Sequence, residues 1–373
     1  MSKPSSGQLR HLFRLLAEDK IAGEALQEII ESHEILVVSQ ITKKMLRQTR
    51  TFASKIKDNH SRAMAFIRIF CVSDDFSDLK NAYRDATLEE GKAVESDVYW
   101  HIKVLTKIYS AVECNERTSY TKNFLNNVCP EIPSSGHLLK QVRELAEALK
   151  EPYWNANSWI VIFSASNFNE DLDMARQAVR RATKNVGQKD SVLKSFAIAL
   201  ADSHLTSKAL KVANSILPYD YQSRGEALAA VAKALAKEGR LKDAREAASK
   251  INNPNWLVVA FANIYAKEED RRDLRRAREV NIDQAGPLFE IYAASREPED
   301  LIRARGAALE CGASDRVKFF AKIAAISHEA VDFTEAEKAI PKITVESSLY
   351  PIENRMFEAW ISLAEAMRTR YLF

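Results

Sequence analysis

Small residues recur in this chain at regular distances from larger apolar residues. In most copies a large apolar residue is followed three positions later by a small one, and a weaker copy starts at Thr206. A small or apolar residue comes four positions further on, and another comes three after that, as in Leu241, Ala244, Ala248 and Ile251. Copies start at residues 46, 79, 172, 206, 241, 274, 301 and 333, and from 172 onward the starts are separated by 34, 35, 33, 27 and 32 residues. A period of this length predicts a repeat architecture.

Spacings of three and four place the apolar residues of each copy on one face of a helix. A second helical pattern precedes each copy, and its clearest example runs through Leu228, Val231, Ala232 and Leu235 before Gly239. Glycine and proline number only ten each, which is too few turn residues for an all-β sandwich of 373 residues. The sequence therefore predicts an all-α fold of antiparallel helix hairpins, in which alanines let neighbouring helices approach closely.

Residues 228–251 resemble the register of the tetratricopeptide repeat family, and Trp159 falls on the position of that family's large first residue. The resemblance covers most of residues 60–370 and implies a right-handed α-solenoid, a TPR-like superhelix. The family's turn glycine is present only at Gly239, and the other copies carry Ser77, Glu170, His204, Arg272, Glu299 or Val331 there. A helical-hairpin solenoid of the HEAT class and a non-repetitive bundle with alanine-rich seams remain alternatives.

The register of the repeats predicts three segments along the chain. Residues 1–40 form N-terminal helices that fit no register, residues 41–132 form N-terminal helical repeats, and residues 133–373 form a C-terminal solenoid with a capping helix around Trp360. Helical patterns at about 117–129, 137–150 and 155–168 leave one helix without a partner. Because this region contains the break from Pro130 to Gly136, we interpret it as a kink or soft boundary.

No catalytic or metal-binding motif is present, and the sequence predicts no enzyme and no cofactor. HExxH, GxSxG, GxxxxGK[ST] and GxGxxG are absent, the seven histidines are dispersed, and the four cysteines form no CxxC pair. An enzyme whose site is assembled across helices remains an alternative, with no residue to nominate. The N-terminus is unlike a signal peptide, and the most apolar stretch is about half the ~20 residues that span a bilayer. We therefore expect a cytoplasmic chain without a membrane partner.

In tetratricopeptide proteins the first helix of each hairpin lines a concave groove that binds a partner protein or peptide. The resemblance implies groove positions two residues after the large first residue of each repeat, and nearby positions add two lysines. The candidates are Arg68, Lys103, Lys194, Lys233, Asn263 and Lys322. Five cations and an amide suit an acidic segment or a C-terminal carboxylate, although ordinary surface polarity is an alternative explanation. The leading prediction is a non-catalytic interaction scaffold or adaptor.

Two basic stretches give different predictions. The first contains no acidic residue between positions 41 and 57, and its cations are Lys43, Lys44, Arg47, Arg50, Lys55 and Lys57. It could contact phosphate, so a nucleic-acid-binding repeat protein is the alternative function, although a solvated helix face explains it equally simply. The second stretch, residues 271–278, is interleaved with acidic residues, which predicts salt bridges within the chain. The formal net charge of +3 gives no general argument for nucleic acid.

Overall fold

A computed structural model of the protein describes residues 43–86, 94–116, 132–184, 188–280, 282–343 and 352–372. Within these ranges every regular element is a helix, as the sequence predicts, and residues 43–53 are helical as well. The elements are α3 (Asn59–Ser73), α4 (Phe76–Ala86), α5 (Glu95–Glu116), α7 (Ser135–Ala148), α8 (Pro152–Ser166), α9 (Asn169–Ala182), α10 (Lys189–Asp202), α11 (Thr206–Asn214), α12 (Tyr221–Lys237), α13 (Leu241–Ala248), α14 (Pro254–Glu268), α15 (Arg271–Glu279), α16 (Ala285–Ser295), α17 (Pro298–Glu310), α18 (Ala313–Ser327), α19 (Ala330–Ala339), the short 3-10 helix η1 (Ile340–Lys342) and α20 (Ile352–Leu372).

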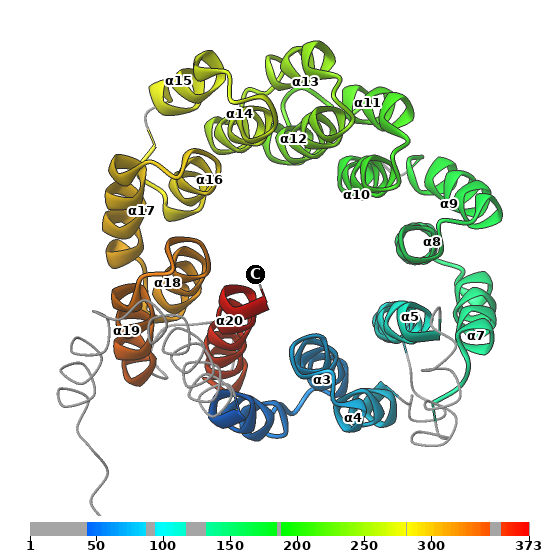
Figure 1. Ribbon diagram of the computed structural model, residues 1–373. Coiled ribbons are helices and arrows are strands. Elements are labelled where there is room, and N and C mark those ends of the chain that lie inside the picture. The colour runs from blue at the N-terminus through cyan, green and yellow to red at the C-terminus, as the bar shows by residue number, and fades with distance from the viewer. Residues whose placement is uncertain are drawn as a thin grey trace, which may run out of the picture.

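The helices lie in two concentric layers around a common centre (Figure 1). The inner layer consists of α3, α5, α8, α10, α12, α14, α16, α18 and α20, and the outer layer of α4, α7, α9, α11, α13, α15, α17 and α19. Each inner helix from α3 to α18 packs against an outer helix that follows it in the chain, and also against the next inner helix. The last helix, α20, lies beside α3, so the first and last parts of the described chain meet.

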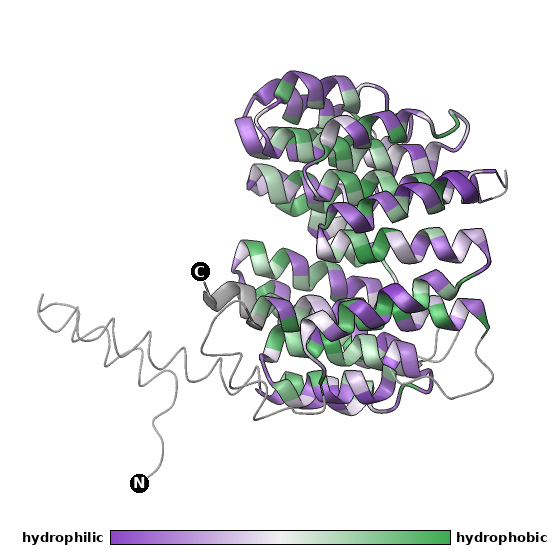
Figure 2. Cartoon of the chain, turned by 90° about the vertical axis from the view of Figure 1, so that its right-hand side faces the viewer, coloured by the Kyte–Doolittle hydropathy of each residue, from purple (hydrophilic) through white to green (hydrophobic). Residues whose placement is uncertain are grey.

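The recurring small residues are the places where the two layers touch. The first small residue of each copy from α4 onward is no more than 1% exposed; these are Ala82, Ala175, Ala209, Ala244, Ala277, Ala304 and Ala336. A side chain of one methyl group lets two helix backbones come close, and larger residues such as Leu228 and Phe320 fill the space beside it. One hydrophobic core therefore continues from helix to helix, and each helix seen in Figure 2 carries both apolar and hydrophilic residues.

The turns between inner and outer helices differ from the tetratricopeptide register in where the left-handed turn residue lies. A residue with positive φ occurs in seven of these turns, at Asp74, Asn167, His204, Gly239, Glu269, Arg296 and His328. Only His204 and Gly239 stand where the family register expects the turn glycine. In the other five hairpins the left-handed residue precedes the large apolar residue by five positions instead of two, because a longer turn leads to an aspartate in the first turn of the outer helix.

The described residues cover only part of the predicted segments. The patterns at 137–150 and 155–168 correspond to α7 and α8, whereas 117–129 and 1–40 lie outside the described residues. The division at residue 133 stays a prediction, and α5 packs against both α7 and α8, which lie on the other side of it. None of the described helices is both long enough and apolar enough to cross a membrane.

Candidate functional site

The predicted groove residues lie on inner helices, and each has its own local environment. Arg68 on α3 donates hydrogen bonds to Glu358 at 2.7 Å and to Glu365 at 3.0 Å, both on α20. Its guanidinium also lies 5.8 Å from the centre of the Phe357 ring. Two carboxylates of the same chain therefore compensate the charge of Arg68, and the contact joins helices almost 300 positions apart in the sequence.

A pocket of about 670 Å³ lies beside this contact, where α3, α5, α18 and α20 meet. Its wall combines apolar side chains such as Met64 and Phe357 with Arg68, Glu358 and Trp100, whose ring is partly exposed. Arg68 and Glu358 also line a second pocket, of about 380 Å³, between α3, α18 and α20. The seam between the two ends of the described chain is therefore incompletely filled.

A separate pocket of about 400 Å³ lies on the inner layer between α5, α8 and α10; we call it the α5–α10 pocket. It is lined by Lys103, Thr106, Lys107, Ser110, Ile160, Val161, Ser164, Ala165, Lys194, Ser195, Ile198, Ala199, Asp202 and Glu226. Two predicted residues, Lys103 and Lys194, are thus brought together here. Lys194 forms an ion pair with Glu226 at 3.0 Å, whereas Lys103 has no acidic partner among the described residues. Burial and the neighbouring Lys107 ammonium lower the pKa of Lys103.

The remaining groove candidates are dispersed. Lys322 on α18 is exposed and lies 5.5 Å from the Phe289 ring centre, at a pocket of about 280 Å³ between inner helices α12, α14, α16 and α18. Asn263 on α14 donates one hydrogen bond to the carbonyl of Val259 at 2.7 Å, which leaves its amide oxygen and its second amide hydrogen for a ligand. Lys233 on α12 is exposed. The structure therefore brings the six candidates to one layer without gathering them into a single site.

The basic stretch at 43–57 lies at the start of the described chain. Its lysines and Arg47 are exposed, and the Lys55 ammonium lies 5.3 Å from the centre of the Phe52 ring. Arg50 differs, because it donates to Asp78 at 2.8 Å and 2.6 Å and to Asp75 at 3.0 Å. Its hydrogen bonds to Asp78 are the main reason that the pKa of Arg50 is raised. Five of the six cations remain accessible to an external anion.

Arg50 belongs to a set of arginine–aspartate pairs that the sequence analysis missed. The five buried aspartates of the described chain each accept hydrogen bonds from an arginine on the preceding outer helix or, for Asp78, on the helix at residues 43–53; the pairs are Arg50–Asp78, Arg143–Asp171, Arg245–Asp273, Arg278–Asp300 and Arg305–Asp332. In four of them a serine five residues before the aspartate donates as well, as Ser327 does to Asp332 at 2.6 Å. The sequence carries the signal, because four of the arginines (all but Arg143) directly follow the first small residue of a copy and each aspartate directly precedes a large apolar residue. These pairs connect successive outer helices.

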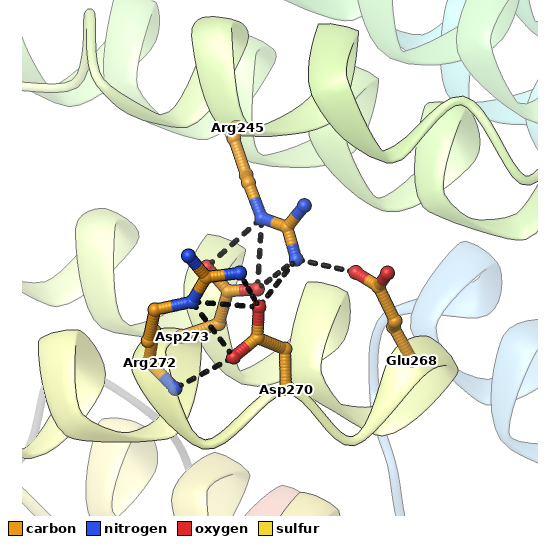
Figure 3. Close-up of polar contacts among 5 residues, drawn as sticks. All are labelled: Arg245, Glu268, Asp270, Arg272 and Asp273. Carbon is orange, nitrogen blue, oxygen red and sulfur yellow. Dashed lines mark hydrogen bonds and ion pairs between the residues drawn. The ribbon is translucent and has the colours of Figure 1, made fainter.

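One pair has the geometry of a metal site but is already neutralised. Ligand oxygens of Glu268, Asp270 and Asp273 lie within 4.8 Å of one another. Figure 3 shows the Arg245 guanidinium among them, bonded to Asp273 at 2.7 Å, to Asp270 at 3.4 Å and to Glu268, while Arg272 bonds Asp270 at 2.8 Å. The hydrogen bonds from Arg272 lower the pKa of Asp270 to about 2. Since a guanidinium occupies the position a cation would take, we interpret this cluster as a structural contact. The prediction that the second basic stretch pairs with its interleaved acids is confirmed for Arg272, whereas Arg278 pairs with Glu297 and Asp300, which lie outside the stretch.

The fold and the pockets together define the protein as all-α, with two layers of helices and polar pockets between the helices of the inner layer. Comparison with models of protein families, with curated proteins and with solved structures finds no match for this chain.

Proposed function

We propose that the chain is a right-handed α-solenoid of antiparallel helix hairpins, similar in build to tetratricopeptide repeat proteins. In this proposal it acts as a non-catalytic scaffold that binds a segment of a partner protein along its inner layer. The observation that carries the proposal is the series of pockets between neighbouring inner helices, from α5 to α20. An extended segment could place one side chain into each pocket, which is how repeat proteins combine many small contacts into one interface.

The contrast between the layers supports the choice of the inner one. On the outer layer, recurring arginines and aspartates bond to each other, so much of the strong polar chemistry is used within the chain. On the inner layer, Lys103, Lys107 and Lys322 have no carboxylate within ion-pair distance among the described residues, and they lie at pockets. Cations at concave polar sites favour an acidic partner segment.

Site-specific photo-crosslinking tests the proposal. A crosslinking amino acid is placed at Val161 or Phe289 on the inner layer, and at the exposed Lys242 of α13 on the outer layer as the matched control. We expect both inner positions to capture the same protein and the outer position to capture none of it. Equal capture at Lys242, or different proteins at Val161 and Phe289, would contradict a shared inner binding face.

A nucleic-acid-binding function is the second candidate, and the exposed cations of residues 43–57 favour it. Replacing phosphate counterions with lysine or arginine side chains makes affinity fall steeply with salt. Anisotropy of a labelled single-stranded or double-stranded 30-mer at rising salt measures this directly. Absence of binding at low salt eliminates the candidate, and binding that survives neutralisation of Lys43, Lys44 and Arg47 places it elsewhere.

A further inference from the structure

Two lysines in the α5–α10 pocket carry charge that no described acidic residue compensates. Lys103 and Lys107 are four residues apart on α5, so their side chains share one face of the helix and repel each other. Lys103 is half-buried, and its partial compensation within the chain comes from the Trp100 ring, whose centre lies 4.5 Å from the ammonium. Burial of a repelling cation disfavours the folded chain, and such features concentrate where a ligand later supplies the missing partner.

Two other cations of the inner layer have carboxylate partners. Lys194 lines the same pocket and is neutralised by Glu226, and Arg68 is neutralised by Glu358 and Glu365. Within a single pocket, Lys194 has an acidic partner, whereas no described acidic residue forms an ion pair with either lysine of α5. The lysine pair is therefore a local excess of positive charge.

The pocket's remaining groups indicate which anion fits. The hydroxyls of Thr106, Ser110 and Ser195 already donate to backbone carbonyls of their own helices, so the main donors left are the two ammonium groups, together with the exposed hydroxyl of Ser164. Ile160, Val161, Ile198 and the alanines supply an apolar wall for aliphatic carbons. Asp202 and Glu226 at the α10–α12 side would repel a second anion close by. One carboxylate on a short aliphatic stem matches these features better than a chain of phosphates.

We propose that the α5–α10 pocket binds the carboxylate of a glutamate side chain in a partner segment, held between the ammonium groups of Lys103 and Lys107. The inference rests on the proposed scaffold function and names the chemistry that one of its pockets recognises. The methylenes of the glutamate lie against Ile160 and Val161, and its charge relieves the repulsion between the two lysines.

The test uses the full chain and a capped (Glu-Ala)4 peptide with a neutral fluorophore, and (Gln-Ala)4 as the uncharged probe. Fluorescence anisotropy gives the affinities of the unmodified chain and of the double variant Lys103→Gln/Lys107→Gln. The matched control is Lys208→Gln/Lys211→Gln, since these exposed lysines lie three residues apart on outer helix α11 and outside the pocket. Thermal melting accompanies each measurement, and removing mutual repulsion should leave the melting temperature of the pocket variant unchanged or raised.

We expect (Glu-Ala)4 to bind about tenfold or more weakly to the pocket variant, because two charge-assisted hydrogen bonds are lost, and less than about twofold more weakly to the control. Equal binding of (Gln-Ala)4, equal loss in both variants, or no loss in the pocket variant would overturn the assignment. Competition by inorganic phosphate that exceeds competition by acetate at equal concentration would overturn the choice of a carboxylate. Crosslinking from Val161 and Phe289 tests the scaffold function separately. If the pocket variant captures the same partner equally well, the scaffold function stands and only the assignment of this pocket is wrong.

Discussion

Substitution of Asp332 tests whether the arginine–aspartate pairs hold successive outer helices together. Its carboxylate is fully buried and accepts bonds from Arg305 Nε and Nη2, both at 2.7 Å, and from Ser327 Oγ at 2.6 Å. Removing one member of a buried ion pair typically costs about 3–5 kcal/mol. Because Arg305 is one-quarter exposed and keeps Glu329 at 2.8 Å, we expect Asp332→Ala to cost about 3 kcal/mol, near the low end.

Urea unfolding followed by circular dichroism measures the cost, and a double-mutant cycle with Arg305→Met isolates the pair. We expect a coupling energy of about 1.5–3 kcal/mol, within the range of residues that share a buried network. Glu335→Ala is the control, since Glu335 pairs with the exposed Lys338 on the same helix and its loss should cost no more than about 0.5 kcal/mol. Hydrogen exchange should rise first in α17–α20, because repeats are stabilised by their nearest neighbours. A coupling energy below about 0.5 kcal/mol would refute the reasoning, since it would make the buried pair equivalent to a surface contact.

Three further predictions concern packing, protonation and the seam. Gly225→Ala should cost about 1–3 kcal/mol, because its new Cβ would lie 3.0 Å from Trp256 Cδ1, whereas Gly306→Ala on the open face of α17 should stabilise by about 0.5–1 kcal/mol. Melting curves in which both changes have the same sign would contradict this. Burial lowers the pKa of His101 from 6.5 to about 4, so the unfolded chain takes up a proton at a higher pH than the folded chain does. The contribution of neutral His101 to the free energy of unfolding should be fully present above pH 6.5, and it should fall by up to about 3 kcal/mol toward pH 4. Unfolding at pH 7 and pH 5 should show a smaller decrease for His101→Phe than for the unmodified chain, and equal decreases would contradict it. Arg68→Gln should broaden the distribution of distances between spin labels on α3 and α20, because the three hydrogen bonds to Glu365 and the one to Glu358 are lost or weakened. An unchanged distribution would show that apolar contacts alone close the seam.

The helices could be predicted from the sequence because their signal is local. Residues three and four apart decide which face of a helix is apolar, and the buried alanines Ala244 and Ala277 lie where that pattern places them. The turns are less predictable, because the tetratricopeptide register places a glycine in them. In this chain, residues such as Asp74 and Glu269 adopt the left-handed conformation, and their N–H groups bond to carbonyls four residues earlier at 2.8 Å and 2.7 Å. A non-glycine residue in the left-handed region costs about 1 kcal/mol, and the hydrogen bond and the packing of the two helices offset this cost. Composition does not report that compensation.

The candidate site could be predicted only in part because charge neutralisation depends on contacts between distant residues. Groove spacing correctly placed Lys103 on an inner helix, but it missed Lys107 one turn later and gave no sign that Lys194 is neutralised. The partners of Arg68 lie 290 and 297 residues away, and no local pattern reports them. The arginine–aspartate pairs were accessible, since aligning the repeat copies would have shown both residues at fixed positions.

The chain uses its two kinds of cation differently, and the difference agrees with their chemistry. Arginine forms the buried pairs of the outer layer, where its planar fork can donate two parallel bonds to one carboxylate, as Arg143 does to Asp171 at 2.8 Å and 2.8 Å. Lysine provides the uncompensated charge of the inner layer, at Lys103, Lys107 and Lys322. A flexible stem with a compact charge can follow a ligand that arrives in more than one position, whereas a fork fixes one geometry. Rigid pairing between successive hairpins and adaptable charge facing the centre are what the proposed scaffold function requires, because the curvature of the inner face must be constant while the bound segment varies.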